Sequence, residues 1–382
     1  MSHSPLAAFC DATILTGEAV VENHALLVGG GSIVDIVPNR HVPAEAQKIA
    51  CGGQILAPGL IDAQVNGGGN AQFNNDPSAA TCLTIAKAHR AYGTTRLLPT
   101  CITDTPDITR RAVAAVREAG KTDPSILGIH LEGPHLAKDR RGIHHTTSLR
   151  SLNADDLTLY RRAGDEVMLI TLAPETVGVK DIENLAKQAI VSIGHTNALP
   201  EQIRAALAAG ASGFTHLYNG MGGMDARSPN VVGTALDDRN SWCGLIADGH
   251  HVAPEMIRLA LRAKPVGKVF LVSDAMAPAA TTTPKDFLLY GDTIHTQGTR
   301  CATATGTLAG SAVTLLDCVR HCVRNVGIDL DEALRMASTY PAAFLGLGHR
   351  LGKLLPTYTA DIIAVDEALS LKGVWVEAEK LG

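Results

Sequence analysis

The stretch AIVSIGHTNALPEQIRAALAAGASGFTH, residues 189–216, decides the fold class. It contains a run typical of a buried strand at 189–195, apolar residues at helical spacing over 199–210, and a second strand at 212–216. Each of the two strands ends on a histidine. A strand, a helix and another strand in this order predict parallel strands joined by a helical connection.

The same alternation extends in both directions from this stretch. Helix-period segments lie between most of the strand candidates, and eight β/α repeats over about 215 residues match a (β/α)8 barrel of the TIM type, an α/β fold. The strand candidates are residues 59–65, 94–100, 126–132, 166–173, 189–195, 212–216, 243–248 and 268–274. Two further helical stretches, 311–327 and 329–346, follow the eighth strand.

Both ends of the chain have β character instead. Short β segments punctuated by Gly and Pro fill residues 11–58, and β character returns at 359–379. The Gly29-Gly30-Gly31 cluster favours a hairpin turn over a dinucleotide-binding loop, because the SIVDIV that follows it is strand-like and not helical. We therefore predict a small β-sandwich formed by the N- and C-terminal segments, 1–57 and 349–382, beside a barrel at 58–348.

Composition excludes several classes of protein. The 382 residues are 46% hydrophobic, which is enough for a large core and argues against disorder. The net charge is −5 and no basic run stands out, so neither nucleic acid nor an anionic membrane surface is an expected partner. No apolar run reaches membrane-spanning length, and the first residues lack the features of a signal peptide. The eight cysteines form no CxxC pair or disulfide framework, so we expect a cytoplasmic protein.

Ligand-type side chains stand at the ends of the predicted barrel strands. Glu132 ends the third strand, His195 the fifth, His216 the sixth and Asp274 the eighth. Strand C-termini share one face of a barrel, so these residues should converge there. A single histidine at a strand end is more often a satisfied polar residue than a ligand. One carboxylate with two imidazoles, however, suits a borderline metal such as zinc.

Other residues admit more than one interpretation. Asp274 is a further ligand, a proton carrier or a helix N-cap. Residues 66–70, NGGGN, form either a backbone-lined approach to a ligand or a tight turn. Arg227, in a loop after the sixth strand, is either a phosphate contact or an ordinary surface arginine.

These residues also belong to a recognisable series of motifs. PGLIDAQVNGGG, HLEGPHL, GHTNA, THLYNGM, IADGHHV, LVSDA and GTLAGS occur in this order across nearly the whole chain. The series resembles the N-acetylglucosamine-6-phosphate deacetylases of the amidohydrolase superfamily. The resemblance implies a metal-dependent barrel beside a β-sandwich made from both termini, as the strand pattern also predicts.

The resemblance assigns roles by motif. It implies that Glu132, His195 and His216 are the metal ligands and that Asp274 is the catalytic acid and base. His144 would contact the substrate and polarise its acetyl carbonyl. The arginine of the phosphate site would come from the other subunit of a homodimer. The substrate-binding positions it implies are Ile143, His144, Asn219, Gly220, Arg227, His251, Leu308, Ala309 and Gly310, the last three in a loop over the sugar.

One departure from the wider superfamily bears on the metal count. Many members carry HxH at the end of the first strand and bind two metals, whereas this chain has Gln64-Val65-Asn66. Amides are poor zinc ligands beside imidazoles. We therefore expect one divalent ion per subunit, with zinc as the expected metal.

The expected reaction is hydrolysis of the acetamide of N-acetyl-D-glucosamine 6-phosphate to D-glucosamine 6-phosphate and acetate. The galacto epimer is the nearest alternative, because the sequence does not show which residue contacts the 4-hydroxyl. A metal-free aldolase-type barrel would need a Schiff-base lysine, and none of the eight predicted strands ends in Lys. A non-catalytic sugar-phosphate sensor would not be expected to keep Asp274.

Overall fold

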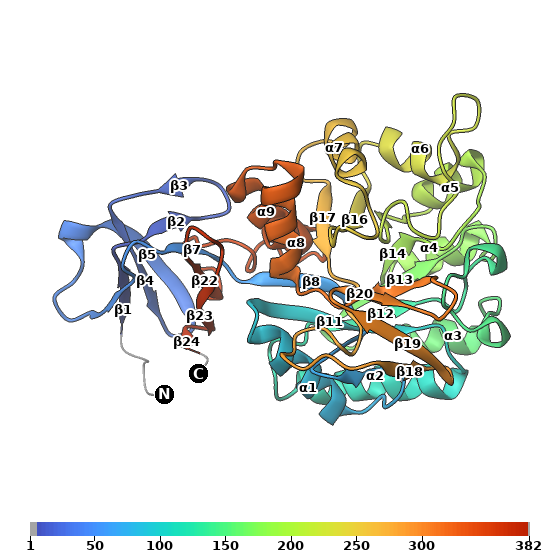
Figure 1. Ribbon diagram of the computed structural model, residues 1–382, viewed down its shortest axis with the longest axis horizontal. Helices are drawn as coiled ribbons and strands as arrows, with labels where there is room; N and C mark the ends of the chain where they lie inside the picture. Colours follow the sequence, from blue (N-terminus) through green and yellow to red (C-terminus); the bar gives the residue numbers. More distant parts are fainter. Residues whose placement is uncertain (1–5, 381–382) are drawn as a thin grey trace.

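A computed structural model describes residues 6–380, and its chain forms two parts that lie side by side (Figure 1). The larger part is built on an eight-stranded sheet whose neighbouring strands are all parallel. This confirms the predicted barrel. In sheet order its strands are β8 (Leu60–Val65), β11 (Thr94–Ile102), β12 (Gly128–Glu132), β13 (Val167–Leu172), β14 (Ile190–Ile193), β15 (Gly213–Phe214), β16 (Trp242–Ile246) and β17 (Val269–Val272).

The barrel closes where the first strand meets the residues after the last. The Asp274 amide donates to the carbonyl of Gln64 at 3.1 Å, and the Asn66 amide donates to the carbonyl of Ala275 at 2.8 Å. Val65 and Ala275 form a parallel bridge at the same place. Residues at opposite ends of the barrel sequence therefore become neighbours.

Helices cover the outside of the barrel (Figure 1). Several begin at residues that favour a helix start: the Ser78 hydroxyl accepts from the Thr81 amide, and Pro106 opens α2 after the cap Thr105. The helices are α1 (Ala79–Arg90), α2 (Pro106–Gly120), α3 (Ala154–Leu159), α4 (Val179–Ala186), α5 (Pro200–Ala208), α6 (Asn230–Asp237), α7 (Pro254–Ala263), α8 (Leu315–His321), α9 (Leu330–Ala337) and α10 (Thr339–Phe344). Shorter turns are η1 (Asn39–His41), η2 (Lys138–Arg140), η3 (Thr146–Ser148) and the π-helix η4 (Cys322–Val326) that continues α8.

The helical stretch predicted at 329–346 is two helices, because the chain breaks at Ser338. Pro341 lies in the first turn of α10. Its ring would clash with the carbonyl of Ala337 in a continuous helix, and α9 ends at that residue.

The smaller part consists of two sheets, and the second contains strands from both ends of the chain. This confirms the predicted sandwich, while its boundaries at 57 and 349 stay predictions. Its core includes Phe9 against Trp375, with ring centroids 4.9 Å apart. The first sheet is β5 (Ser32–Pro38), β4 (His24–Gly29), β1 (Ala7–Cys10) and β6 (Gln47–Ala50). The second is β24 (Glu379–Lys380), β23 (Leu371–Val376), β22 (Ile362–Val365), β7 (Ile55–Pro58), β2 (Thr13–Leu15) and β3 (Val20–Val21).

A small antiparallel sheet between β17 and α8 was not predicted from the sequence. Its strands are β18 (Phe287–Leu289), β19 (Asp292–Gln297), β20 (Arg300–Ala302) and β21 (Leu308–Ser311). The prediction of a loop at 308–310 is therefore wrong, because these residues lie in strand β21. Two glycine turns mark the hairpins, at Gly291 (φ 89°) and Gly298 (φ 60°). A shorter hairpin joins β9 (Gly67–Gly68) to β10 (Ala71–Gln72).

Within residues 6–380, no helix is long and apolar enough to cross a membrane.

A buried ion pair joins the barrel to the C-terminal segment. The Arg96 guanidinium, on β11, donates to both oxygens of Asp361 at 2.6 and 3.0 Å, and to Glu377 at 3.1 Å. The side chains of Arg96 and Asp361 are 5% and 7% exposed. Replacing both partners of such a pair together changes the stability little. Removing one partner is costly, because it leaves an uncompensated buried charge.

We predict that Asp361→Ala lowers the free energy of unfolding by about 3–5 kcal/mol, the usual cost of breaking a buried ion pair. Urea unfolding followed by circular dichroism measures it. The control is Glu118→Ala, which removes the partner of Lys121 in a pair that is 63% and 69% exposed and should leave unfolding nearly unchanged. Equal effects in the two variants would contradict the structural role given to Arg96.

Candidate active site

The predicted ligand-type residues do gather at the C-terminal face of the barrel. Glu132 is the last residue of β12, and the other three follow their strands by two residues. Those three, His195, His216 and Asp274, all adopt positive φ, at 49°, 34° and 49°. Side-chain-bearing residues rarely adopt this conformation, which costs about 1–3 kcal/mol and is over-represented at active sites.

Three of these side chains converge on one point. His195 Nε2 and His216 Nε2 lie 3.1 and 2.7 Å from Glu132 Oε1, and 3.0 Å from each other. All three residues are at most 7% exposed. The second nitrogen of His195, Nδ1, donates to the Arg140 carbonyl at 2.7 Å, so in the neutral ring Nε2 has no hydrogen left to share with Glu132. A cation between these acceptors would satisfy all of them, and the donor set fits zinc.

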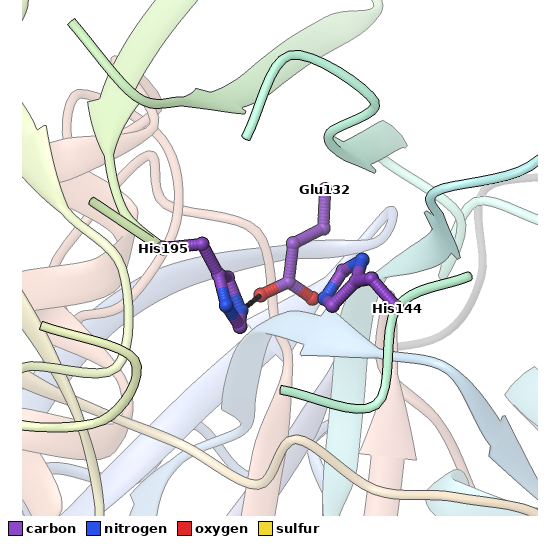
Figure 2. Close-up of side chains that lie close together, drawn as sticks. All are labelled: Glu132, His144 and His195. Carbon is purple, nitrogen blue, oxygen red and sulfur yellow. Dashed lines mark hydrogen bonds and ion pairs between the residues drawn. The ribbon is translucent and has the colours of Figure 1, made fainter. Parts of the chain in front are cut away.

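A fourth candidate lies beside this group. Glu132, His144 and His195 also bring one ligand atom each within 4.8 Å of one another. Figure 2 shows the Glu132 carboxylate between the rings of His195 and His144. Burial lowers the pKa of His144 to about 3, so its ring is neutral near pH 7. The geometry therefore offers three imidazoles to one carboxylate, where the sequence suggested two.

Asp274 faces this group and is held by two amides. The Asn66 side chain donates to Asp274 Oδ1 at 2.7 Å. The Gln64 side chain donates to the same oxygen at 3.1 Å and to Glu132 Oε2 at 3.1 Å. Burial, reinforced by the negative charge of Glu132, raises the pKa of Asp274 to about 6. Gln64 and Asn66 are the residues that replace the HxH pair, and they bind carboxylates instead.

A cavity of about 260 Å³ opens onto these groups. Eleven of the thirteen residues predicted for the site line it: Glu132, Ile143, His144, His195, His216, Asn219, Gly220, His251, Asp274, Leu308 and Gly310. A larger cavity of about 620 Å³ lies near the opposite ends of the strands, and its Arg96 and Arg117 are already paired with acidic side chains. The smaller cavity is the one that the predicted site residues line.

Arg227 and Ala309 do not line the cavity of their own chain. Arg227 is exposed, and its backbone amide binds the Asp225 side chain in a loop turn. Ala309 is fully buried and packs with Ile102 and Met276 instead, because alternate residues of β21 face opposite ways.

Two of the lining residues are fixed by close neighbours. The Asp248 carboxylate accepts from His251 Nδ1 at 2.7 Å, which orients the other ring nitrogen of His251. Gly220 has φ 61°, and a Cβ there would lie 2.8 Å from Nδ1 of His195. Glycine at this position therefore lets the backbone pass close to the His195 ring.

Some of the lining residues were not predicted from the sequence. Apart from Asn66, which was singled out only as part of a loop, they are Ile102, Gly142, Ile246, Met276 and Thr307. Most of them are apolar or glycine and carry no chemical signal. Ile102 and Ile246 are the last residues of β11 and β16, and this position is what could have identified them.

Comparisons with known proteins agree with this geometry. The Amidohydrolase family matches residues 55–380, and the NagA composite domain matches residues 7–56. The chain is 38% identical to an N-acetylgalactosamine-6-phosphate deacetylase of Shewanella sp. (strain ANA-3), over 97% of this chain and 94% of that protein. It is 34% identical to the human N-acetylglucosamine-6-phosphate deacetylase, over 97% and 94%.

A solved structure shares the whole fold. The crystal structure of N-acetylglucosamine-6-phosphate deacetylase from Pasteurella multocida superposes with a TM-score of 0.95 at 35% identity, covering 99% of this chain and 100% of that one. The barrel and the two-ended sandwich thus occur together in this relative as well. The chain belongs to the Amidohydrolase family, among its N-acetylhexosamine-6-phosphate deacetylases.

Proposed function

We propose that this protein hydrolyses the acetamide of N-acetyl-D-glucosamine 6-phosphate, giving D-glucosamine 6-phosphate and acetate. The observation that carries the proposal is the meeting of two groups in one cavity. One is the convergence of Glu132, His195 and His216, and the other is the restrained carboxylate of Asp274. Together they supply a cation site and a proton carrier, which is what hydrolysis of an unactivated amide needs.

Glu132, His195 and His216 would hold one divalent ion per subunit, and we propose Zn²⁺. Such an ion lowers the pKa of a water molecule toward about 7 and polarises a carbonyl oxygen. His144 is left outside the ligand set. It contacts the substrate and donates a hydrogen bond to the acetyl oxygen as negative charge develops there.

Asp274 moves the proton. Its Oδ1 already accepts from Gln64 and Asn66, so Oδ2 is the oxygen available to take a proton from the attacking water. The same carboxyl then gives that proton to the nitrogen of the departing amine, which must leave neutral. A pKa of about 6 suits both steps, because the group is ionised near neutral pH yet accepts a proton readily.

The remaining residues would bind the sugar phosphate. We assign the sugar to Ile143, His144, Asn219, Gly220, Leu308, Ala309 and Gly310, with Ala309 acting through its backbone. We assign the phosphate to His251 and to Arg227 of a partner subunit in a homodimer. The exposure of Arg227 and its absence from the cavity of its own chain support this arrangement. The proposal also includes a cytoplasmic location, which the cysteine pattern predicts.

The galacto epimer is a second candidate substrate. The 38%-identical relative from Shewanella bears the name N-acetylgalactosamine-6-phosphate deacetylase, and so does a 33%-identical relative from Escherichia coli O157:H7. The epimers differ only at the 4-hydroxyl. Both would use the same ligands and the same proton carrier.

The test of the function is acetate release from the two epimeric 6-phosphates, measured side by side. We expect turnover of both, because the reacting acetamide is identical, with the larger kcat/KM for the gluco epimer. A larger value for the galacto epimer would move the assignment to that sugar. Release from neither would leave a sugar-phosphate sensor.

Mutations should distinguish the role of the metal site from that of the proton carrier. We predict that Glu132→Ala loses both the ion and the activity, because two imidazoles alone hold a cation less well. Asp274→Asn should keep about one ion per chain while kcat falls by about 10²–10⁴-fold, the usual contribution of general acid–base catalysis. Elemental analysis and acetate release on the same samples measure both. Two tightly held ions in wild type, or near-normal turnover in Asp274→Asn, would count against these roles.

Arg227→Ala should affect binding more than turnover, because the phosphate lies far from the reacting amide. Loss of a charge-assisted hydrogen bond predicts a rise in KM of roughly 10- to 150-fold, with kcat within a few-fold. The control substrate is the unphosphorylated acetamido sugar, which wild type should use poorly and the variant should use about equally poorly. A mutation that impairs both substrates equally would make Arg227 structural.

A further inference from the structure

We infer that Thr103 fixes His144 in the tautomer with hydrogen on Nε2, which makes His144 a hydrogen-bond donor and removes it from the metal-ligand set. Thr103 follows β11 directly and is 1% exposed. Thr103 does not itself line the cavity, and besides His144 its hydroxyl reaches only the backbone carbonyl of Glu132, at 3.4 Å, so it acts through His144 as a positioning residue. The inference deepens the proposed function. It rests on that function only in naming the acetyl oxygen of the substrate as the acceptor of the His144 hydrogen bond.

The contacts of His144 Nδ1 decide the tautomer. The backbone amide of Thr103 donates to Nδ1 at 3.3 Å, and the Thr103 hydroxyl lies 2.8 Å from the same atom. A backbone N–H can only donate, so Nδ1 must be an acceptor here. A neutral imidazole has one N–H, which then lies on Nε2.

Both ring nitrogens of His144 are thereby unsuited to a metal. Nδ1 has its lone pair engaged by Thr103, and Nε2 carries a hydrogen in place of a lone pair. His195 has the opposite arrangement, since its Nδ1 donates to the Arg140 carbonyl and its Nε2 is left free to ligate. The ring centroids of His144 and His195 are only 4.4 Å apart. The hydrogen bonds to their Nδ1 atoms nevertheless give them different roles, one as a hydrogen-bond donor and the other as a metal ligand.

Thr103 is itself held from the small sheet after β17. The Tyr290 hydroxyl donates to the Thr103 carbonyl, and the Tyr290 ring stacks on His145 with centroids 5.2 Å apart. His144 is restrained on its other side, where its amide donates to the Arg141 carbonyl at 3.0 Å. These contacts give the Thr103 amide a fixed direction toward the ring.

The first test compares one substitution at two histidines. His144→Gln should keep about one ion per chain, whereas His195→Gln should lose it. Elemental analysis after dialysis measures both without any substrate. The kcat of His144→Gln should fall by up to about 10²–10³-fold, the effect of removing one donor to a developing oxyanion. Loss of the ion from His144→Gln would overturn the inference.

The second test changes Thr103 itself. Thr103→Val keeps the shape and the backbone donor but loses the hydroxyl, and Thr103→Ser restores it. We expect kcat of Thr103→Val to fall by roughly 2- to 12-fold, the effect of one ordinary hydrogen bond, with KM and metal content unchanged and with recovery in Thr103→Ser. An unchanged kcat in Thr103→Val, or loss of the ion from it, would overturn the inference.

The third test observes the tautomer in wild type, so it does not depend on a variant that folds. Nitrogen NMR of histidine-labelled, zinc-loaded protein distinguishes the two ring nitrogens, and the signals missing from His144→Gln identify His144. Hydrogen on Nε2 supports the inference and hydrogen on Nδ1 overturns it. If Nε2 carries the hydrogen but neither sugar phosphate is hydrolysed, the tautomer assignment stands and the proposed function fails.

Discussion

The seam between β8 and the end of β17 is the constraint on which the site depends. Backbone hydrogen bonds join Gln64 and Asn66 to Asp274 and Ala275 across this seam, and they close the barrel. Asp62, on the same strand, accepts from the Ser273 amide at 3.3 Å below them. This backbone pairing places the side chains of Gln64, Asn66 and Asp274 next to one another. The contacts that complete the fold are therefore also the contacts that assemble the proton carrier.

The amide pair at this seam gives the site its electrostatic character. Imidazoles at Gln64 and Asn66 would offer lone pairs, whereas amide groups offer hydrogens. The Gln64 side-chain amide donates to two carboxylates: Glu132, which contacts the histidines, and Asp274, which faces the same group. Two nearby carboxylates are thus kept at a fixed separation, and burial together with the negative charge of Glu132 raises the pKa of Asp274.

Much of the fold was visible in the sequence because barrel strands are buried on both faces. Runs such as 166–173 are almost continuously apolar, and β13 lies inside that range. The residues at the strand ends were visible because Glu132, His195 and His216 interrupt such runs. The sheet β18–β21 was missed because its strands are short and the longest of them, β19, is mainly polar, and β1 was missed because it has only four residues. Thr103 could not be singled out, because a threonine shows its role only through the His144 ring that the fold brings to it.

The pairing of β7 with β22 has a consequence for how the chain is made. Pro58 pairs with Ile362, so the ribosome must synthesise roughly 300 further residues before the second sandwich sheet can form, a separation that slows any folding step. During that interval the nascent chain holds β7 with one edge unpaired, next to barrel strands that are already complete. Premature termination after the barrel would leave this edge permanently open, and an open edge is a template for aggregation. Strand β22 pairs with this edge of β7 and so keeps it from pairing with another chain.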